Sequence, residues 1–137
     1  MIDLYALTSP NVQKIYLMLE ETKLPYKEHF VDVWKGEQYN ADFIKINPNS
    51  KIPAIVDSDG PGGKPITIFE SGAILIYLAE KTGRFMPKDA AARYNVLQWL
   101  FFRPRASARC SASSPTSRCS RPRGPITRIR WIVIRPR

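Results

Sequence analysis

The sequence has 137 residues, enough for one domain and the beginning of another. Its formal net charge of +9 is unevenly distributed. Residues 1–100 hold nine Lys, two Arg and all twelve acidic residues, whereas residues 101–137 hold ten Arg and no acid. Both cysteines, Cys110 and Cys119, lie in the same final segment. The main body is therefore neither a basic DNA-reading globule nor a secreted disulfide scaffold.

Signals for a membrane, a metal or a bound nucleotide are missing from the sequence. No apolar run approaches the roughly 20 residues that span a bilayer, and the N-terminus has no leader pattern, so we expect a cytoplasmic protein. His29 is the only histidine. It has no neighbouring cysteine or carboxylate cluster, and we expect a structural or surface role for it and no metal site.

The first third of the chain predicts a β-α-β unit. Residues 2–6 alternate as a short strand, and Ser9 followed by Pro10 is typical of a helix N-cap and first helical position. Apolar residues then recur at helical spacing until Leu24-Pro25, and residues 26–33 form the next expected strand. Two strands joined by a helix are expected to run parallel with a right-handed crossover.

The middle of the chain predicts a hairpin followed by a helix. Residues 34–46 indicate a loop with a short irregular helix. Residues 54–57 and 66–69 are expected strands, separated by a turn-forming segment rich in Gly and Pro. Ser71 is the expected N-cap of a helix that runs to about Lys81 and ends at Thr82-Gly83.

This order of elements predicts an α/β protein, a thioredoxin-like β-α-β-β-β-α domain with a mixed sheet over residues 1–83. The helix at 71–81 is apolar on nearly all sides, so we expect it to be buried on two faces. A further amphipathic helix begins at Ala90. We interpret residues 88–102 as the first helix of an incomplete all-α domain.

Two motifs carry a resemblance to a known family. The run Asn47-Pro-Asn-Ser-Lys-Ile-Pro-Ala54 before a strand, and Phe69-Glu-Ser-Gly-Ala-Ile74 at a helix start, resemble the N-terminal domain of a glutathione transferase. The opening residues are most similar to the bacterial nu-class branch. The resemblance covers residues 1 to about 102. It implies that glutathione is the co-substrate, that the protein forms a homodimer, and that a small electrophile or a disulfide is its reaction partner.

The resemblance implies roles for four residues around the third strand and the following helix. Pro53 would be a cis-proline, the alternative being an ordinary trans proline, and Ile52 would pair its backbone with the cysteinyl unit of glutathione. Ser71, unless it is only a helix cap, would bind the γ-glutamyl carboxylate at a helix N-terminus. Glu70 would pair with the ligand ammonium group.

The catalytic residues implied by the resemblance are Ser9 and Asn11, which would donate hydrogen bonds to the glutathione sulfur and favour its thiolate. Tyr5 is the alternative, because other classes use a tyrosine near this strand. For the glycine carboxylate of glutathione we expect Gln38 and Lys51, with Lys35 as the less favoured candidate. Each lysine could instead be a solvated surface charge.

The segment 103–137 breaks the family pattern. It is rich in Arg, Pro and Ser and has no Lys, Asp, Glu, Asn or Gln. Codons compatible with Arg103–Ala112, read one base out of frame, spell Gln-Ala-Ala-Gly-Leu-Gly-Pro-Met-Phe-Gly, which fits nu-class-like sequences at this point. We interpret the segment as an off-frame, disordered tail. The alternative is an Arg-rich tail that binds nucleic acid through phosphate contacts.

The residues and the family resemblance together predict a glutathione transferase-type protein. It would bind glutathione and activate its thiol for conjugation to electrophiles or for disulfide reduction. Loss of the helical domain is expected to impair turnover and to weaken binding. A non-catalytic glutathione-binding or thioredoxin-like interaction module is the alternative function.

Overall fold

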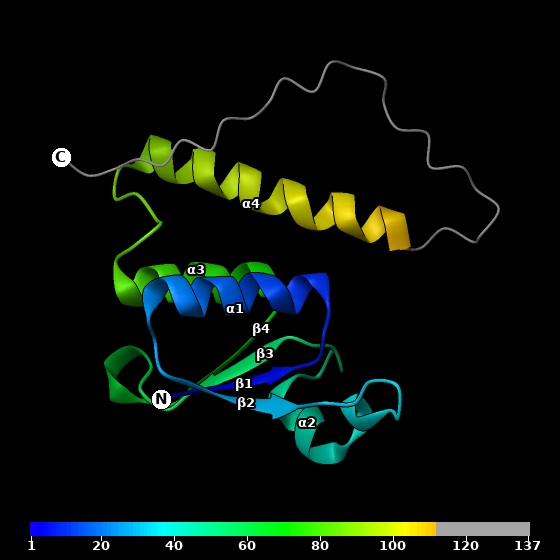
Figure 1. Ribbon diagram of the computed structural model, residues 1–137. Coiled ribbons are helices and arrows are strands. Elements are labelled where there is room, and N and C mark those ends of the chain that lie inside the picture. Colours follow the sequence, from blue (N-terminus) through cyan, green and yellow to red (C-terminus); the bar gives the residue numbers. More distant parts are fainter. Residues whose placement is uncertain (112–137) are drawn as a thin grey trace.

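The computed structural model describes the backbone of residues 1–111 and the side chains of residues 1–102. The elements follow one another as β1 (Ile2–Ala6), α1 (Pro10–Thr22), β2 (Tyr26–Phe30), η1 (Glu37–Tyr39), α2 (Ala41–Ile46), β3 (Ala54–Asp57), η2 (Pro61–Gly63), β4 (Ile66–Phe69), α3 (Ser71–Thr82) and α4 (Ala90–Ser111). Figure 1 shows α1 and α3 on one face of the sheet and α2 on the other, with α4 beyond α1 and α3. The thioredoxin-like α/β prediction is confirmed.

The sheet is mixed, with strand order β2-β1-β3-β4. β1 pairs in parallel with β2, and β1–β3 and β3–β4 are antiparallel. The parallel pair needs a crossover, which α1 supplies, and the antiparallel pair β3–β4 is joined by the turn segment 58–65, which contains η2. Gly60 is required in that turn, because an added Cβ would lie 2.6 Å from the Lys64 carbonyl oxygen.

The main core lies between the sheet and the pair α1–α3. Alternate residues of β1 face this side, as expected for a strand with a period of two. The fully or nearly fully buried residues are Ile2, Leu4, Ala6, Val12, Ile15, Leu19, Ile55, Ile74 and Leu78. A smaller cluster of Val31, Phe43 and Ala54 joins α2 to the opposite face of the sheet. The two clusters fix the helices on both faces.

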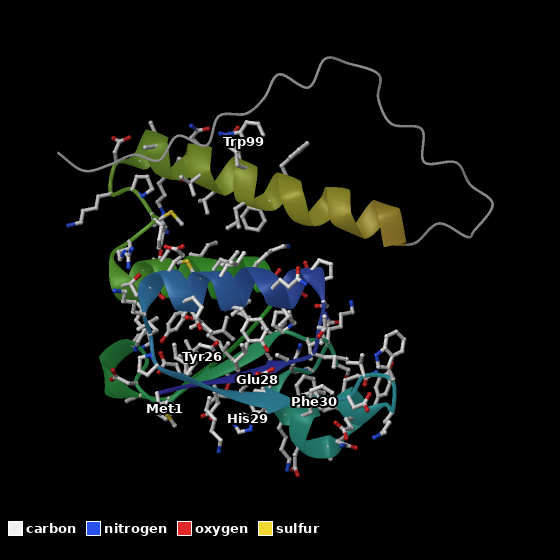
Figure 2. All side chains as sticks on the ribbon, viewed as in Figure 1. Met1, Tyr26, Glu28, His29, Phe30 and Trp99 are labelled. Carbon is white, nitrogen blue, oxygen red and sulfur yellow. The ribbon has the colours of Figure 1, made fainter. Side chains whose placement is uncertain are left out.

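β2 is shorter than the sequence predicts and ends at Phe30 rather than Val33. Val31 N–H still donates to the Ala6 carbonyl, at 2.9 Å, but the chain then turns. The Asp32 carboxylate accepts from the amides of Trp34 (3.0 Å) and Lys35 (3.3 Å), which closes a local turn. Figure 2 shows the labelled residues of β2, from Tyr26 to Phe30, along the edge of the sheet.

Two helix ends differ from expectation. Glu70, not Ser71, is the N-cap position of α3, and Ser71 is already the first helical residue. α4 runs to Ser111, nine residues past Phe102, where we placed the beginning of a disordered tail. Five of residues 103–111 are Arg or Ala, which are among the strongest helix formers and favour this continuation, whereas Pro104 in the same stretch disfavours it.

Residues 112–137, the remainder of the segment interpreted as off frame, lie outside the described residues. Among the helices that the structure describes, none has both the length and the apolar character needed to cross a membrane.

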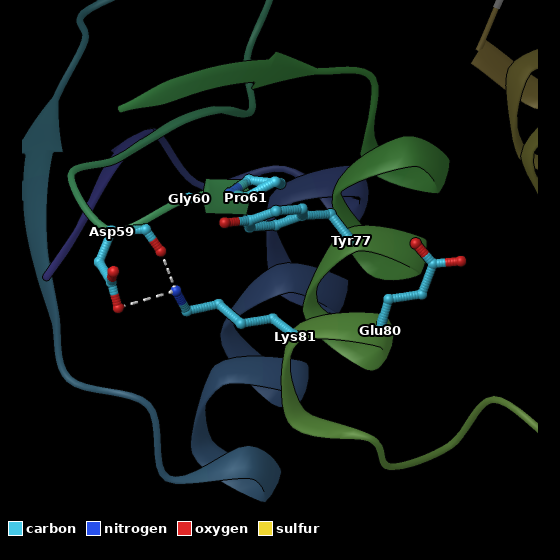
Figure 3. A pocket seen from close by; sticks show the side chains of 6 residues that line it. All are labelled: Asp59, Gly60, Pro61, Tyr77, Glu80 and Lys81. Carbon is cyan, nitrogen blue, oxygen red and sulfur yellow. Dashed lines mark hydrogen bonds and ion pairs between the residues drawn. The ribbon is translucent and has the colours of Figure 1, made fainter. Parts of the chain in front are cut away.

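A cluster of charged and polar side chains joins the C-terminal end of β3 to α3. Asp57 is fully buried and accepts from Tyr77 Oη at 2.6 Å and from the Asp59 amide at 2.9 Å. Lys81 Nζ lies 2.9 Å from Asp57 Oδ2 and 3.5 Å from Asp59 Oδ2. A hollow of about 370 Å³ adjoins this cluster, with Lys81 turned toward Asp59 and the Tyr77 ring beside Pro61 (Figure 3). Because the carboxylates already neutralise Lys81, we assign the cluster a structural role.

This cluster gives the fold a predictable acid sensitivity. Burial alone would raise the pKa of Asp57, but hydrogen bonds from Tyr77, the Asp59 amide and Lys81 lower it below 3.8. A lowered folded-state pKa stabilises the fold above the ordinary carboxyl pKa, and this contribution is lost as the pH falls through the folded-state pKa. Asp57→Asn should cost about 3 kcal/mol of unfolding free energy near neutral pH and clearly less in strong acid.

Urea titrations at both pH values measure this difference. Asp42→Asn is the matched control, because its exposed carboxylate pairs with exposed Lys45, and we expect no measurable change. An equal loss of stability at the two pH values for Asp57→Asn would contradict the assigned ionisation.

Candidate functional site

A groove runs along one end of the sheet and consists of two adjoining hollows. The larger, of about 500 Å³, is lined by Leu7, Thr8, Ser9, Asn11, Val33, Trp34, Gln38, Tyr39, Asn49, Ser50, Lys51 and Ile52. The smaller, of about 60 Å³, is lined by Asn11, Asn47, Lys51, Ile52, Pro53, Glu70 and Ser71. Because they share Asn11, Lys51 and Ile52, the hollows form one continuous site. All eight site residues expected from the sequence line it.

The N-terminus of α1 forms one side of the groove. Ser9 has extended backbone and its Oγ accepts from the Val12 amide at 3.3 Å, which confirms the predicted N-cap. Accepting this bond leaves the Ser9 hydroxyl hydrogen available for a second partner. Asn11 uses Oδ1 to accept from Lys14 Nζ at 2.8 Å and keeps its Nδ2 donors for another group. Both side chains can therefore donate toward an anion.

The segment before β3 forms the floor of the groove. The Ile52–Pro53 peptide bond is cis, as the resemblance implied. The pairing of β3 with β1 begins at Ala54, so the peptide groups of Ile52 lie beyond the ladder. Asn47, 1% exposed, holds this segment, because its Nδ2 donates to the Lys51 carbonyl at 2.6 Å and its Oδ1 accepts from the Asn49 amide at 2.9 Å. Ile52 can thus pair with an extended peptide.

The N-terminus of α3 closes the smaller hollow. Glu70 has a φ of 69°, in the left-handed region that favours glycine. Its Oε1 accepts from Asn49 Nδ2 at 3.2 Å, which joins α3 to the floor of the groove. Ser71 is 7% exposed and sits in the first turn, where amides lack intrahelical partners and the helix dipole favours an anion. The first turn of α3 can therefore hold a carboxylate of a ligand, and the Glu70 carboxylate can hold a cationic group beside it.

Gln38 and Lys51 add polar groups to the wall of the larger hollow. Among the described residues, Gln38 Oε1 is the buried side-chain polar atom without a hydrogen-bond partner. An unsatisfied acceptor of this kind costs about 1–3 kcal/mol unless a ligand or water donates to it. Lys51 is exposed and supplies a cation at the junction of the two hollows. The pair is suited to the polar end of a peptide ligand.

Three residues weighed in the sequence analysis lie outside the groove. Tyr5 lines a different hollow, next to α2, and stacks on His29 with ring centroids 4.8 Å apart. Burial raises the pKa of the Tyr5 phenol, and the Asp3 charge adds to the rise. His29 Nε2 lies 2.7 Å from Asp3 Oδ1, in keeping with a structural role. Lys35 lines neither hollow and pairs with Asp32 at 3.5 Å.

The sequence reasoning missed eight residues that line the groove. They are Leu7, Thr8, Val33, Trp34, Tyr39, Asn47, Asn49 and Ser50. Asn47 and Asn49 stand inside the motif that carried the resemblance, and their polar side chains beside a buried turn were a usable signal. Trp34 and Tyr39 gave no signal, because they fall in a segment without periodicity. In the part of the chain described, no three His, Cys, Asp or Glu side chains come together as metal ligands.

The sequence that forms this groove matches a known protein family. The family model for the N-terminal domain of glutathione S-transferases matches residues 8–81. The disulfide-bond oxidoreductase YfcG of Escherichia coli is 54% identical over 103 residues, which cover 74% of this chain and 48% of YfcG. This chain therefore spans about half the length of that curated relative.

The chain is also similar to solved structures of glutathione transferases. A glutathione transferase family member from Pseudomonas fluorescens, crystallised with two glutathione molecules, is 49% identical with a TM-score of 0.74, over 76% of this chain and 46% of that one. A glutathione transferase from Pseudomonas putida with glutathione disulfide bound is 50% identical with a TM-score of 0.73, over 75% and 45% of the two chains.

The cap at the start of α1 can be tested independently of any ligand. Ser9→Ala removes the acceptor of the Val12 amide and should lower the free energy of unfolding by about 1 kcal/mol. Ser9→Asp keeps a cap acceptor and should retain most of the stability. Chemical denaturation of the three proteins measures the difference. Equal stability of the alanine variant and the parent chain would show that Ser9 is not an effective cap.

Proposed function

Since the glutathione S-transferase N-terminal model matches more than half of this chain, the chain belongs to that family, and we propose that its groove binds glutathione and stabilises its thiolate. The observation that carries this proposal is the convergence of the N-termini of α1 and α3 on the two sides of Ile52 and Pro53. Each helix N-terminus favours an anion, and the segment between them can pair with an extended peptide.

The proposed assignment of groups follows the chemistry of the tripeptide. The γ-glutamyl carboxylate binds the Ser71 hydroxyl and the first amides of α3, and the neighbouring ammonium group pairs with Glu70. The cysteinyl backbone pairs with Ile52 in the manner of an added strand. Lys51 neutralises the glycine carboxylate. Gln38 offers both an acceptor for a ligand N–H and donors for the same carboxylate.

The thiol is assigned to the side of the groove formed by α1. The Ser9 hydroxyl and the Asn11 amide donate to sulfur, and the positive end of the helix dipole lowers the thiol pKa. Tyr5 is not part of this proposal, since it lines another hollow. Since the residues that line the groove include no cysteine, we take the reactive sulfur from the ligand.

The reaction proposed is attack by this thiolate on an electrophile or on a disulfide. In the second case the glutathione thiolate forms a new S–S bond with one sulfur of the disulfide, and the other sulfur leaves as a thiolate. The names of the relatives, a disulfide-bond oxidoreductase and a transferase with glutathione disulfide bound, favour the disulfide reaction. A cytoplasmic location belongs to the same proposal, since reduced glutathione is the co-substrate required.

Binding of the γ-glutamyl end is tested with Glu70→Gln. This change removes the charge that faces the ligand ammonium and should weaken glutathione binding about tenfold in isothermal titration calorimetry. Glu80→Gln is the matched control, because Glu80 is an exposed glutamate of α3 that pairs with Arg93, away from the groove. Parent-like affinity of both variants would contradict the assignment of Glu70.

Activation of the thiol is tested by titrating the bound glutathione with pH and following the ultraviolet absorbance of its thiolate. The parent chain should lower the thiol pKa below its ordinary value of about 8.5. Ser9→Ala should raise the bound pKa by about one unit, and Ser9→Thr should restore it, because threonine keeps the hydroxyl donor.

The titration also separates this function from its alternative. Glutathione bound with an unshifted thiol pKa in the parent chain would favour a non-catalytic glutathione-binding module. No shift between the parent chain and Ser9→Ala would remove Ser9 from the catalytic proposal.

A further inference from the structure

The Glu70 carboxylate is held by a residue from another part of the chain. Glu70 is the N-cap residue of α3, with a φ of 69° and a ψ of 118°, and its side chain makes no capping hydrogen bond to the helix that it begins. A long side chain that is not held loses entropy when a ligand fixes it. Among residues 1–102, the donor that reaches this carboxylate is Asn49, whose Nδ2 lies 3.2 Å from Glu70 Oε1.

Asn49 is in turn fixed by the buried floor of the groove. Its backbone amide donates to Asn47 Oδ1 at 2.9 Å, and Asn47, which is 1% exposed, also donates from Nδ2 to the Lys51 carbonyl at 2.6 Å. The Ser50 amide donates to the Asn47 carbonyl at 2.9 Å and closes the same turn. Because these contacts use the backbone groups of Asn49 and Ser50, they hold the turn and leave the Asn49 side-chain amide for Glu70.

The partner of Glu70 is neutral, and this determines what the carboxylate can still do. An amide that donates to a carboxylate orients it without cancelling its charge, and the remaining lone pairs can accept further bonds. At the other end of β3, by contrast, Lys81 Nζ lies 2.9 Å from Asp57 Oδ2 and compensates that charge. Within residues 1–102, no cation is in ion-pair contact with Glu70. The Glu70 carboxylate is therefore both oriented and available to a cationic group of a ligand.

We propose that Asn49 is a positioning residue that holds the Glu70 carboxylate where the ammonium group of a γ-glutamyl ligand binds. It makes the groove select ligands that carry this free ammonium group over ligands of the same shape that lack it. This inference rests on the proposed function, because it assumes that the ammonium group of glutathione pairs with Glu70. It adds the residue that orients Glu70 and a requirement for an unblocked amine on the substrate.

Isothermal titration calorimetry of the 137-residue chain with glutathione and with glutaryl-cysteinylglycine tests the selectivity. The second compound is glutathione with hydrogen in place of the ammonium group. The parent chain should bind glutathione about tenfold more tightly, because the ammonium group pairs with an oriented carboxylate. Asn49→Ala should reduce this ratio to about threefold by weakening glutathione alone, since the hydrogen bond that orients Glu70 is lost.

A double-mutant cycle determines whether Asn49 acts through Glu70. In the Glu70→Gln background the carboxylate that Asn49 positions is absent, so adding Asn49→Ala should leave the ratio unchanged. A purely structural role of Asn49 in the floor of the groove would instead weaken both compounds equally in both backgrounds. Asn95→Ala is the matched control and should keep the parent ratio, because Asn95 is an exposed asparagine of α4 that lines neither hollow of the groove.

The possible outcomes separate this inference from the proposed function. An unchanged ratio in Asn49→Ala, or an equal loss for both compounds, would overturn the role of Asn49 while leaving glutathione binding intact. A ratio that Glu70→Gln does not reduce would overturn the assignment of Glu70 and this inference with it. Binding of neither compound by the parent chain would overturn the proposed function as well. Circular dichroism of each variant verifies the fold, and Asn49→Ser, a turn-forming residue with a shorter side chain, decides the matter if Asn49→Ala does not fold.

Discussion

The cross-strand pairing at one end of the sheet determines where every part of the groove begins. Tyr5 pairs with Ala54, and Ala54 pairs with Phe69, so the end of β1, the start of β3 and the end of β4 lie in one row. The chain leaves that row toward the start of α1, enters it after Pro53 and leaves it again at Glu70. Since a shift of one residue would turn each strand over, the hydrophobic core that fixes the register also fixes the site.

Close approach of these three segments requires residues with positive φ beside the ends of the strands. Ser50 and Glu70 have φ values of 51° and 69°, and positive φ in residues with a side chain costs about 1 kcal/mol or more. The buried Asn47 bridge and the hydrogen bond between Asn49 and Glu70 offset part of that cost. The polar contacts of the floor thus hold the peptide groups of Ile52 and the first turn of α3 in place for a ligand.

The two ends of β3 have different surroundings and different roles. At its start, Ile52 and Pro53 face a groove with unsatisfied donors and acceptors. At its end, Asp57 is surrounded by donors from Tyr77, Lys81 and the Asp59 amide, and its charge is fully compensated. The polar groups at the end remote from the groove are thus paired within the protein, whereas the groove keeps polar groups free for a ligand.

Local sequence determined the features that depend on neighbouring residues. The Ser9-Pro10 cap, the hairpin around Gly60 and the alternation of β1 were predictable, because caps, turns and strand periodicity act over a few positions. The family motifs also indicated which residues to expect in the site, although their individual roles stay predictions. Only the tertiary structure decided that Ser71 lies inside α3 with Glu70 at the N-cap position, that Tyr5 faces another hollow, and that Trp34 lines the groove. These facts depend on pairing between strands distant in sequence, which places side chains that no local pattern can bring together.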